Sequence, residues 1–435
     1  MKAIEPKTIR IESDNFRALF TPQLIKLRDL FAKRNYELRI AGGAVRDLLM
    51  NIRPADVDFA STATPSQMTE MFEDEKIRML HKKGEEHGTI TCRIDDAENF
   101  EITTLRVDTV CDGRRAKVEY TTNWQLDANR RDLTINSLFL DLHGNVVDYF
   151  GGIRDIEERR IAFVGNARQR IQEDYLRILR YFRFFGRIAD SPEHEIDTIN
   201  AIIENKDGIK GISSERIWTE LKRIVVGRMA DEVVKTMIEQ CGLQRCLGLP
   251  DNCNLNRFRQ VYRLFPKSVE PMTMIASLCE HEDQIAEFHR KTKLSNDERL
   301  LAEFILCQRQ SAIENLQNDD WWIDRIVDLE VRPGHENQPD RLRQRLIQLA
   351  KSVLADEGRI RMLEEFKAPQ FPVTGRDLME AGVKKGPHVR NVLNYLYNIW
   401  KKSRFTRSKS SLLDNANDVD IPDLAKDRKN TKRSS

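Results

Sequence analysis

The chain has 435 residues, a length that allows two to four compact units. Its 71 basic and 69 acidic residues leave a net charge of +2, so composition makes no general case for nucleic-acid binding, and any basic surface must be local. No apolar run approaches the roughly 20 residues that a bilayer requires, and the N-terminus has no apolar signal core. The seven cysteines lack CxxC spacing, which favours reduced thiols in an intracellular protein and no zinc site.

The first part of the chain, from about residue 25 to 165, alternates strand-like and helical segments. Thr64 followed by Pro65 predicts the N-cap and first position of a helix. β-branched residues and alternating polarity predict five strands: Glu37–Ala41, Val57–Ala60, Gly88–Ile94, Phe100–Leu105 and Val146–Tyr149.

From about Arg168 onward the pattern is helical, with apolar residues at three- and four-residue spacing. Ser213 or Ser214 predicts one N-cap and Thr374 another. The predicted helices are Ile171–Phe185, Ser214–Val226, Glu232–Gln240, Asp297–Leu316, Arg341–Ala355 and Val389–Lys402. Strands first and helices later indicate an α+β fold, a mixed-sheet head followed by all-helical parts. Residues 406–435 are polar and are expected to be disordered.

Two motifs in the first part predict a site for a metal–nucleotide complex. Gly42 and Gly43 end an apolar strand, and glycines at a strand-to-helix turn let backbone N–H groups approach a polyphosphate, with Arg46 one helical turn further on. If 56–60 is a strand, Asp56 and Asp58 point to the same side. Such close carboxylates repel each other and are typical of a Mg²⁺ site. Each motif alone is weak, and together they are considerably stronger.

Two further segments add candidate residues. Glu101, on the predicted strand Phe100–Leu105, could be a third carboxylate or an ordinary surface residue. Arg130 and Arg131 precede a helix-like segment, and guanidinium groups bind triphosphate oxygens in a bidentate manner. Asp132 or Asn136 could fix a ribose hydroxyl, although the segment alone would be an unremarkable charged helix start.

A third segment, residues 172–184, suggests base recognition. On one helix Asp174, Arg177 and Arg180 would fall in adjacent turns and form a polar stripe. A carboxylate only accepts hydrogen bonds and a guanidinium only donates them. An Asp–Arg pair can therefore bind cytosine and adenine, which present an amino donor beside a ring-nitrogen acceptor, and reject uracil and guanine. The alternative is an amphipathic helix with a surface ion pair, which would be preferred if this segment stood alone.

Taken together, GGAVRD, the spaced DVD, RRDLTINSL and EDYLRILRYFRF resemble the class II tRNA nucleotidyltransferases, the CCA-adding enzymes, whose head is shared with bacterial-type poly(A) polymerases. The motifs span residues 40–185. The resemblance implies an N-terminal extension (1–24), a polymerase-β-like nucleotidyltransferase head (25–165), and a helical neck (166–230), body (231–370) and tail (371–405). It also implies an enzyme that adds C, C and A to the 3′ end of tRNA from CTP and ATP and releases pyrophosphate.

The resemblance also assigns roles to residues. Asp56 and Asp58 would be catalytic and hold two Mg²⁺ ions, Gly43 and Arg46 would contact the triphosphate, Arg131 would bind the nucleotide, and Asp132 would lie near the ribose. Asp174 and Arg177 would read the base edge, with Arg180 and Arg183 behind them. Residues 108–123 match a flexible element that reorients between C and A addition. Residues 382–387 resemble an element that touches the tRNA backbone, although Arg390 stands where the family often has a small residue.

Partners, compartment and rival functions follow from the same resemblance. The expected partners are the acceptor stem and upper arm of tRNA, with no membrane, and the protein would be a monomer or homodimer. A eukaryotic member would serve mitochondria, cytosol and nucleus. No paired HD motif is present, so no phosphohydrolase activity is expected. The alternatives are a poly(A) polymerase, an enzyme adding only CC or only A, and a non-catalytic RNA-binding protein.

Overall fold

A computed structural model of the chain describes residues 3–80, 88–111, 116–333 and 339–416. The chain divides into two compact units. The first contains residues 1–255 and 286–294, and the second contains 256–285 and 295–435. No helix in the described part is both long and apolar enough to cross a membrane.

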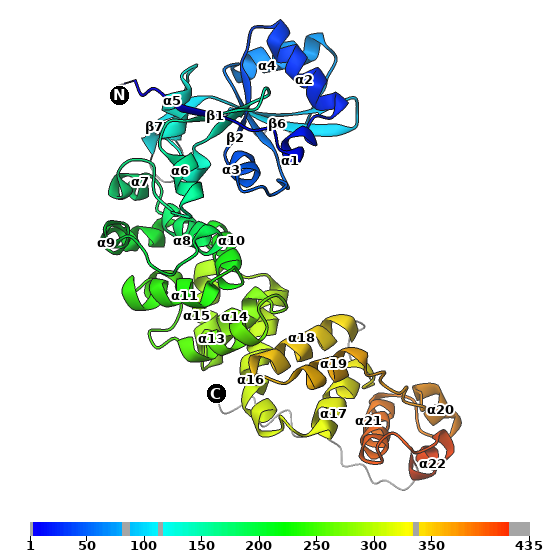
Figure 1. The fold of residues 1–435 in the computed structure, drawn as a ribbon. Coiled ribbons are helices and arrows are strands. Elements are labelled where there is room, and N and C mark those ends of the chain that lie inside the picture. The colour runs from blue at the N-terminus through cyan, green and yellow to red at the C-terminus, as the bar shows by residue number, and fades with distance from the viewer. Residues whose placement is uncertain (1–2, 81–87, 112–115, 334–338, 417–435) are drawn as a thin grey trace. The chain divides into compact units, whose positions relative to one another are not determined.

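The first unit begins with the mixed α+β head (Figure 1), which confirms the predicted fold class. Its helices are α1 (Asp14–Arg17), α2 (Pro22–Lys33), α3 (Gly43–Leu49), α4 (Pro65–Asp74), α5 (Trp124–Asn129) and α6 (Gly152–Glu157). Its strands are β1 (Lys7–Arg10), β2 (Leu38–Ala41), β3 (Asp58–Ser61), β4 (Arg78–Leu80), β5 (Thr89–Ile94), β6 (Glu98–Thr104), β7 (Arg106–Cys111), β8 (Ala116–Tyr120), β9 (Phe139–Asp141) and β10 (Asn145–Asp148).

The described strands form a sheet of eight in the order β1-β10-β9-β2-β3-β6-β5-β4, and β7 pairs separately with β8. β3 and β6 run parallel, and the other neighbours in the large sheet are antiparallel. The parallel register places Asp58 beside Glu101. Behind them Phe59 and Phe100 are buried and meet edge to face at 5.9 Å. The sheet therefore presents two carboxylates in front of an aromatic core.

All five predicted strands overlap observed ones, but β3 differs in a way that matters. It begins at Asp58, so Asp56 lies in the segment before the strand, and Val57 is only partly buried. The expectation of a regular 56–60 strand with Val57 in the core is wrong. The described strands β1, β4, β7, β8 and β9 were not predicted. β1 lies within the expected N-terminal extension, yet it pairs with β10 at the edge of the sheet.

The rest of the first unit is helical. Its helices are α7 (Ala167–Glu173), α8 (Arg177–Ile188), α9 (Ile196–Asn205), α10 (Ser214–Val225), α11 (Ala230–Lys235), α12 (Gln244–Leu247) and most of α15 (Glu282–Thr292). The single predicted helix Ile171–Phe185 is wrong, because the chain breaks after Glu173. Asp174 is extended, with φ −156° and ψ 106°, and its Oδ1 atom accepts a hydrogen bond from the Leu176 N–H at 3.1 Å. A short Asp side chain that bonds to nearby backbone favours such a break.

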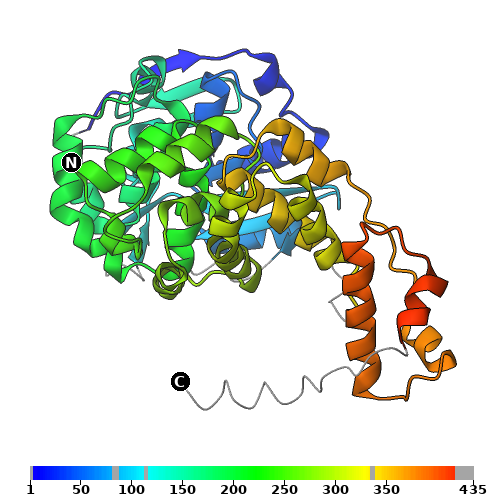
Figure 2. The same cartoon turned by 90° about the horizontal axis from the view of Figure 1, so that it is seen from below.

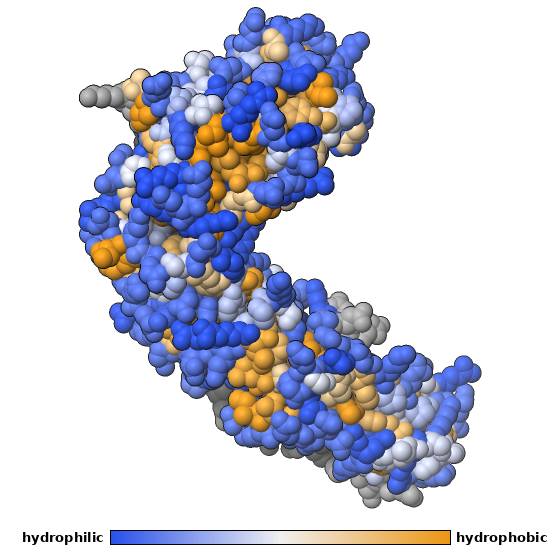
Figure 3. Space-filling model, viewed as in Figure 1, coloured by the Kyte–Doolittle hydropathy of each residue, from blue (hydrophilic) through white to orange (hydrophobic). Residues whose placement is uncertain are grey.

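The described helices of the second unit are α13 (Leu255–Leu264), α14 (Pro271–Leu278), α16 (Asn296–Glu314), α17 (Asp319–Glu330), α18 (Pro339–Ser352), α19 (Glu357–Glu365), α20 (Gly375–Glu380), α21 (Pro387–Lys402) and α22 (Lys409–Leu413). Thr374 caps α20 as predicted, because its hydroxyl accepts from the Asp377 N–H. Figure 2 shows the long α21 beside α20 and α22. Apolar residues are exposed only in patches between hydrophilic ones on the face seen in Figure 3.

The expected disorder from residue 406 onward is wrong for residues 409–416, which are helical. Leu412 and Ala416 are buried in one cluster with Leu396, Tyr397 and Trp400 of α21. Two apolar side chains in a polar segment are enough to hold one short helix against a larger one. Residues 417–435 lie outside the described part of the chain.

The buried Leu412 gives a test of this packing. Leu412→Ala should lower the free energy of unfolding of the second unit by about 2–5 kcal/mol, because it removes a fully buried side chain and leaves a cavity. Chemical denaturation measures this change. Leu264→Ala, in the same unit but 50% exposed, is the matched control and should change it much less. Equal effects of the two variants would show that α22 does not pack on the unit.

Candidate active site

A hollow of about 480 Å³ in the first unit collects nearly all of the predicted site residues. Nine of the ten line it, and Asp56 instead lines a second hollow that shares Asp58 with the first. The first is called the arginine-lined hollow because eight arginines surround it: Arg46, Arg106, Arg130, Arg131, Arg177, Arg180, Arg183 and Arg187. Because the whole chain is nearly neutral, any basic surface was expected to be local, and these arginines form such a surface.

The glycine pair forms one wall of the hollow. Gly42 has φ +67° and ψ −120°, a conformation that side chains disfavour, and a Cβ atom there would lie 2.9 Å from Nη1 of Arg131. Gly43 opens α3 beside it. The turn therefore needs glycine at position 42, and it brings the backbone next to an arginine of the predicted nucleotide site.

Arg46 is less accessible than its expected phosphate contact requires. Its side chain is 4% exposed. Its Nε and Nη2 atoms donate to Asp47 at 3.0 and 2.8 Å, and Nη1 donates to Asn136 at 2.6 Å. Burial is the largest influence on its pKa and lowers it despite Asp47. The structure thus makes Arg46 a support in the wall, and direct contact with a phosphate stays a prediction.

The carboxylates stand at the edge of the hollow. Burial raises the pKa of Asp58, and the neighbouring charge of Asp56 raises it further while Arg131 opposes both. Burial and Asp58 likewise raise the pKa of Glu101. Such mutual repulsion is relieved by a bound cation, so this donor set fits a hard metal ion. Among the described residues no group of three or more His, Cys, Asp or Glu side chains is arranged to hold a metal.

Arg130 and Arg131 follow the end of α5, and the helix-like segment expected after them is a single short 3-10 helix, Thr134–Asn136. Both are held by Asp127, whose side chain is 1% exposed. Its Oδ1 atom accepts from Arg130 Nε at 2.8 Å, and its Oδ2 atom accepts from Arg131 Nη2 at 3.2 Å. Burial alone would raise the pKa of Asp127, but the two arginines outweigh it and the pKa lies below its usual range.

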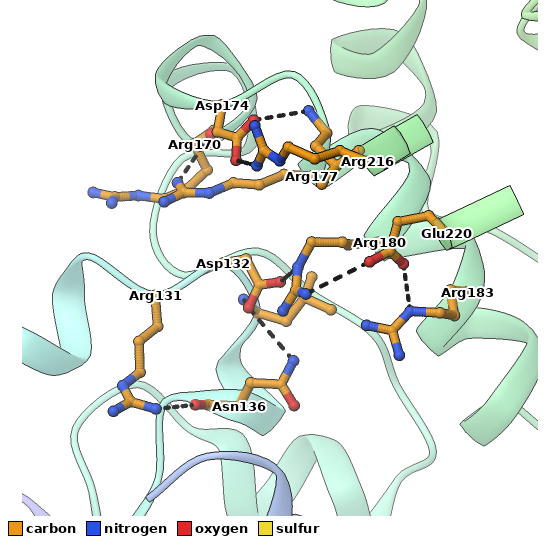
Figure 4. Close-up of polar contacts among 12 residues, drawn as sticks. Arg131, Asp132, Asn136, Arg170, Asp174, Arg177, Arg180, Arg183, Arg216 and Glu220 are labelled. Carbon is orange, nitrogen blue, oxygen red and sulfur yellow. Dashed lines mark hydrogen bonds and ion pairs between the residues drawn. The ribbon is translucent and has the colours of Figure 1, made fainter. Parts of the chain in front are cut away.

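The helix α8 supplies four of the arginines, and each is paired with a carboxylate; Figure 4 shows the pairs of Arg180 with Asp132 and of Arg183 with Glu220. Arg177 donates to Glu173 at 2.6 Å and also to the carbonyl oxygen of Arg130 in the head at 2.9 Å. The remaining pairs are Arg180 with Asp132 at 2.5 Å, Arg183 with Glu220 at 2.5 Å, and Arg187 with Asp47 at 3.0 Å. These side chains are therefore fixed before any ligand arrives, which lowers the cost of binding one.

Asp174 and Arg177 are near neighbours but do not pair with each other. The Asp174 Oδ2 atom accepts from Nη2 of Arg216 on α10 at 2.6 Å, and its backbone carbonyl accepts from the Arg177 N–H at 3.0 Å. The predicted stripe of Asp174, Arg177 and Arg180 on one helix is thus replaced by a turn leading into a helix. All three still line the same hollow.

Sequence comparison agrees with this geometry. The family model described as "Poly A polymerase head domain" matches residues 38–162, and the model described as "Probable RNA and SrmB- binding site of polymerase A" matches residues 194–244. The mouse protein named "CCA tRNA nucleotidyltransferase 1, mitochondrial" is 45% identical over 411 residues, which covers 93% of this chain and 92% of the mouse protein. The human protein of the same name is 44% identical with the same coverage. This chain belongs to the CCA tRNA nucleotidyltransferase family.

Solved structures support the fold of this nucleotidyltransferase. The Bacillus stearothermophilus CCA-adding enzyme in complex with CTP has a TM-score of 0.68 and 21% identity, and the alignment covers 97% of this chain and 100% of the other. The Thermotoga maritima CCA-adding enzyme complexed with tRNA has a TM-score of 0.68 and 18% identity, covering 95% and 99%. At these identities the comparison concerns the fold alone, and it includes the helical parts as well as the head.

Several functional residues of this nucleotidyltransferase were not predicted from the sequence. Asp47, Asp127, Glu220, Arg187 and Arg216 each hold or extend the arginine cluster. For two of them, the spacing in the sequence could have predicted the role. Asp127 precedes Arg130 and Arg131 by three and four residues, and Arg187 continues the helical spacing of Arg180 and Arg183. Asp47 directly follows its partner Arg46, whereas Glu220 and Arg216 come from segments distant from their partners, and no local pattern connects them.

Asp127 gives a stability prediction with a defined pH dependence. Asp127→Asn should lower the free energy of unfolding at pH 7 by roughly 2–3 kcal/mol, because two partly buried arginines lose their counter-charge. Since the folded-state pKa is depressed, the stabilising charge is present above the ordinary carboxyl value of 3.8 and is lost as the pH falls through the lower folded value. The difference between wild type and variant should be constant above pH 3.8 and narrow below it.

Denaturant titrations at several pH values measure this difference. Asp29→Asn is the control, because Asp29 pairs with Arg28 but its side chain is 62% exposed. If Asp127→Asn were no more destabilising than Asp29→Asn at pH 7, the proposed anchoring of the two arginines would be wrong.

Proposed function

We propose that this chain adds C, C and A, without a template, to the 3′ end of tRNA from CTP and ATP and releases pyrophosphate. The observation that carries this proposal is that Asp174 and Arg177 of the helical part line the same hollow as Gly43 and Asp58 of the head. A phosphate-binding and metal-binding wall thus faces a pair of side chains suited to a base edge. The relatives that carry the name CCA tRNA nucleotidyltransferase match over more than nine-tenths of both chains, which supports the same activity.

Asp56 and Asp58 are proposed to hold two Mg²⁺ ions. The family generally uses divalent metals, and the raised pKa of Asp58 beside Asp56 supports a cation at this position. When bound, such ions lower the pKa of an attacking hydroxyl and neutralise the charge on a leaving pyrophosphate. The 3′ oxygen of the RNA would bond to the α-phosphorus of the nucleotide, the bond from that phosphorus to the oxygen bridging to the β-phosphate would break, and the hydroxyl proton would go to solvent.

The remaining head residues would position the nucleotide. Gly43, Arg46 and Arg131 would lie along the triphosphate, and Asp132 would lie near the ribose. Asp132 is buried and already accepts from Arg180 at 2.5 Å, so its effect on the ribose would include holding that arginine. These residues perform no covalent chemistry. They would accelerate the reaction by orientation and by stabilising charge in a site formed in advance.

The base would be read by Asp174 and Arg177. Asp174 would accept from the amino group of cytosine or adenine, and Arg177 would donate to the adjacent ring nitrogen. Arg180 and Arg183 would lie behind Asp174 and Arg177 and would hold those two side chains in place. Because uracil and guanine reverse donor and acceptor, they would leave polar groups of the site unpaired, and such a mismatch can discriminate by roughly 10⁴-fold.

A poly(A) polymerase is the second candidate, since the head matches a family model of that name. It differs in needing only ATP and in continuing beyond three additions. A non-catalytic RNA-binding protein is the third candidate, but it gives no reason to retain two carboxylates that repel each other.

We further propose the acceptor stem and upper arm of tRNA as the RNA surface bound, and mitochondria as one compartment, because the mouse, human and zebrafish relatives are named mitochondrial. Service in the cytosol and nucleus, and a monomeric or homodimeric state, remain predictions.

The activity is tested by incubating the protein with Mg²⁺, CTP, ATP and a tRNA transcript that lacks its 3′ CCA, and sizing the product. We expect growth by C, C and A that then stops, and loss of growth on chelation or in Asp58→Asn. Because that variant removes a carboxylate whose charge is disfavoured in the fold, its melting temperature should be equal or higher. Long A tails without CTP would identify a poly(A) polymerase, and no extension by wild type would leave only the binding role.

Base selection is tested separately by Asp174→Asn. An amide can donate to the O4 atom of uracil, which a carboxylate cannot do. The ratio of kcat/KM for UTP to that for CTP should therefore rise at least tenfold. A change of this size corresponds to roughly the free energy of one hydrogen bond to a charged group. Asp197→Asn, a change of the same type on an exposed position of α9, is the control. An unchanged ratio in Asp174→Asn would remove Asp174 from base recognition.

A further inference from the structure

The second hollow, which contains Asp56, has no role in the account so far. Its volume is about 700 Å³, and it lies entirely in the first unit. It is walled by the turn between α1 and α2, by the segment 53–57 before β3, and by parts of β5 and β6. Asp58, Phe59 and Glu101 line both hollows. The two hollows therefore adjoin the same pair of carboxylates, Asp58 and Glu101.

The two hollows differ strongly in charge. The first has eight arginines, whereas Arg53 is the only basic residue among the described residues that line the second. Apolar side chains make up part of the second wall, among them Leu19, Leu24 and Phe100. A triphosphate with several negative charges suits the first hollow. Because Asp56, Asp58, Glu98 and Glu101 also line the second hollow, a ligand there can carry at most a single phosphate charge, held by Arg53, beside an apolar ring.

Arg53 is available for such a phosphate. Its side chain is exposed and forms no ion pair with any described residue. The next residue, Pro54, is buried and restricts the backbone of Arg53 to extended conformations, which fixes where the side chain leaves the chain. In contrast, the acidic Glu98 on the same wall already accepts a hydrogen bond from the Thr21 hydroxyl at 2.6 Å.

Phosphoryl transfer places the attacking and leaving oxygens roughly in line on opposite sides of the phosphorus. If the triphosphate occupies the arginine-lined hollow, the attacking hydroxyl must reach the α-phosphorus from the side away from the pyrophosphate, and the second hollow adjoins the first at Asp58 and Glu101. We propose that the second hollow receives the 3′-terminal nucleotide of the RNA, and that Arg53 pairs with the phosphate on the 5′ side of that nucleotide. This inference rests on the proposed function, and it makes Arg53 a positioning residue for the attacking 3′-hydroxyl.

The test measures single addition of CMP, at saturating CTP, to an RNA hairpin that copies the acceptor stem. Two forms of the RNA are used, one natural and one with a neutral methylphosphonate at the last internucleotide linkage. With natural RNA, Arg53→Ala should lower kcat roughly tenfold, with KM for CTP changed less than about twofold. Arg53→Lys, which keeps the charge, should restore most of kcat. Arg78→Ala, an exposed head arginine on β4 that lines neither hollow, is the matched control.

The decisive result is the combination of variant and RNA. Neutralising the linkage should slow wild type roughly tenfold and should not slow Arg53→Ala further, because the interaction is already absent. The inference would be overturned if the neutral linkage slowed Arg53→Ala by the same factor as wild type, or if Arg53→Ala were as fast as Arg78→Ala. Either result would leave the proposed function intact. If wild type fails to extend even the natural hairpin and a full tRNA, the proposed function itself fails, and this inference with it. Melting curves check that Arg53→Ala is folded.

Discussion

Pairing of buried arginines with carboxylates is the interaction on which this site depends. Burying guanidinium groups without partners is prohibitively costly, yet a triphosphate and a base edge both require donors that point into one hollow. The chain meets both needs by giving each arginine of α8 a carboxylate partner from another segment, as in the pairs Arg180–Asp132 and Arg183–Glu220, and the more exposed Arg187 pairs with Asp47. Two of these carboxylates lie in the head, so the same ion pairs that allow burial also join the helix to the sheet domain.

A guanidinium group has five N–H donors, and a carboxylate partner uses only some of them. Arg180 donates from Nε to Asp132, which leaves its other nitrogens directed toward the hollow and the more distant Glu220. Arg46 lies at the opposite extreme, since all three of its nitrogens are bonded within the protein. The arginines therefore divide by how many donors remain available. The carboxylates at the sheet edge complement them, because Asp58 and Glu101 bring negative charge that only a cation or a proton can relieve.

The sequence was informative where function and local pattern coincide. The glycine turn, the aspartates and three of the four arginines of α8 were found from short motifs, and nine of ten predicted residues line one hollow. The prediction of one helix through Asp174 failed because helical periodicity cannot show that a side chain will bond to its own backbone. β1 was missed because its four residues are mostly exposed and are ordered by pairing with β10, far along the chain. Glu220 and the Asp47–Arg187 pair were missed for a related reason, since the tertiary fold alone brings these partners together.

The most direct test of this account is a crystal structure of the protein with Mg²⁺ and a CTP analogue whose α–β bridge cannot be cleaved. The account predicts the triphosphate beside Gly43 and Arg131, metal at Asp56 and Asp58, and the cytosine edge against Asp174 and Arg177, with the arginine–carboxylate pairs of α8 unchanged from the free protein. A base bound away from Asp174 and Arg177, or arginines that leave their carboxylates to reach the ligand, would contradict it.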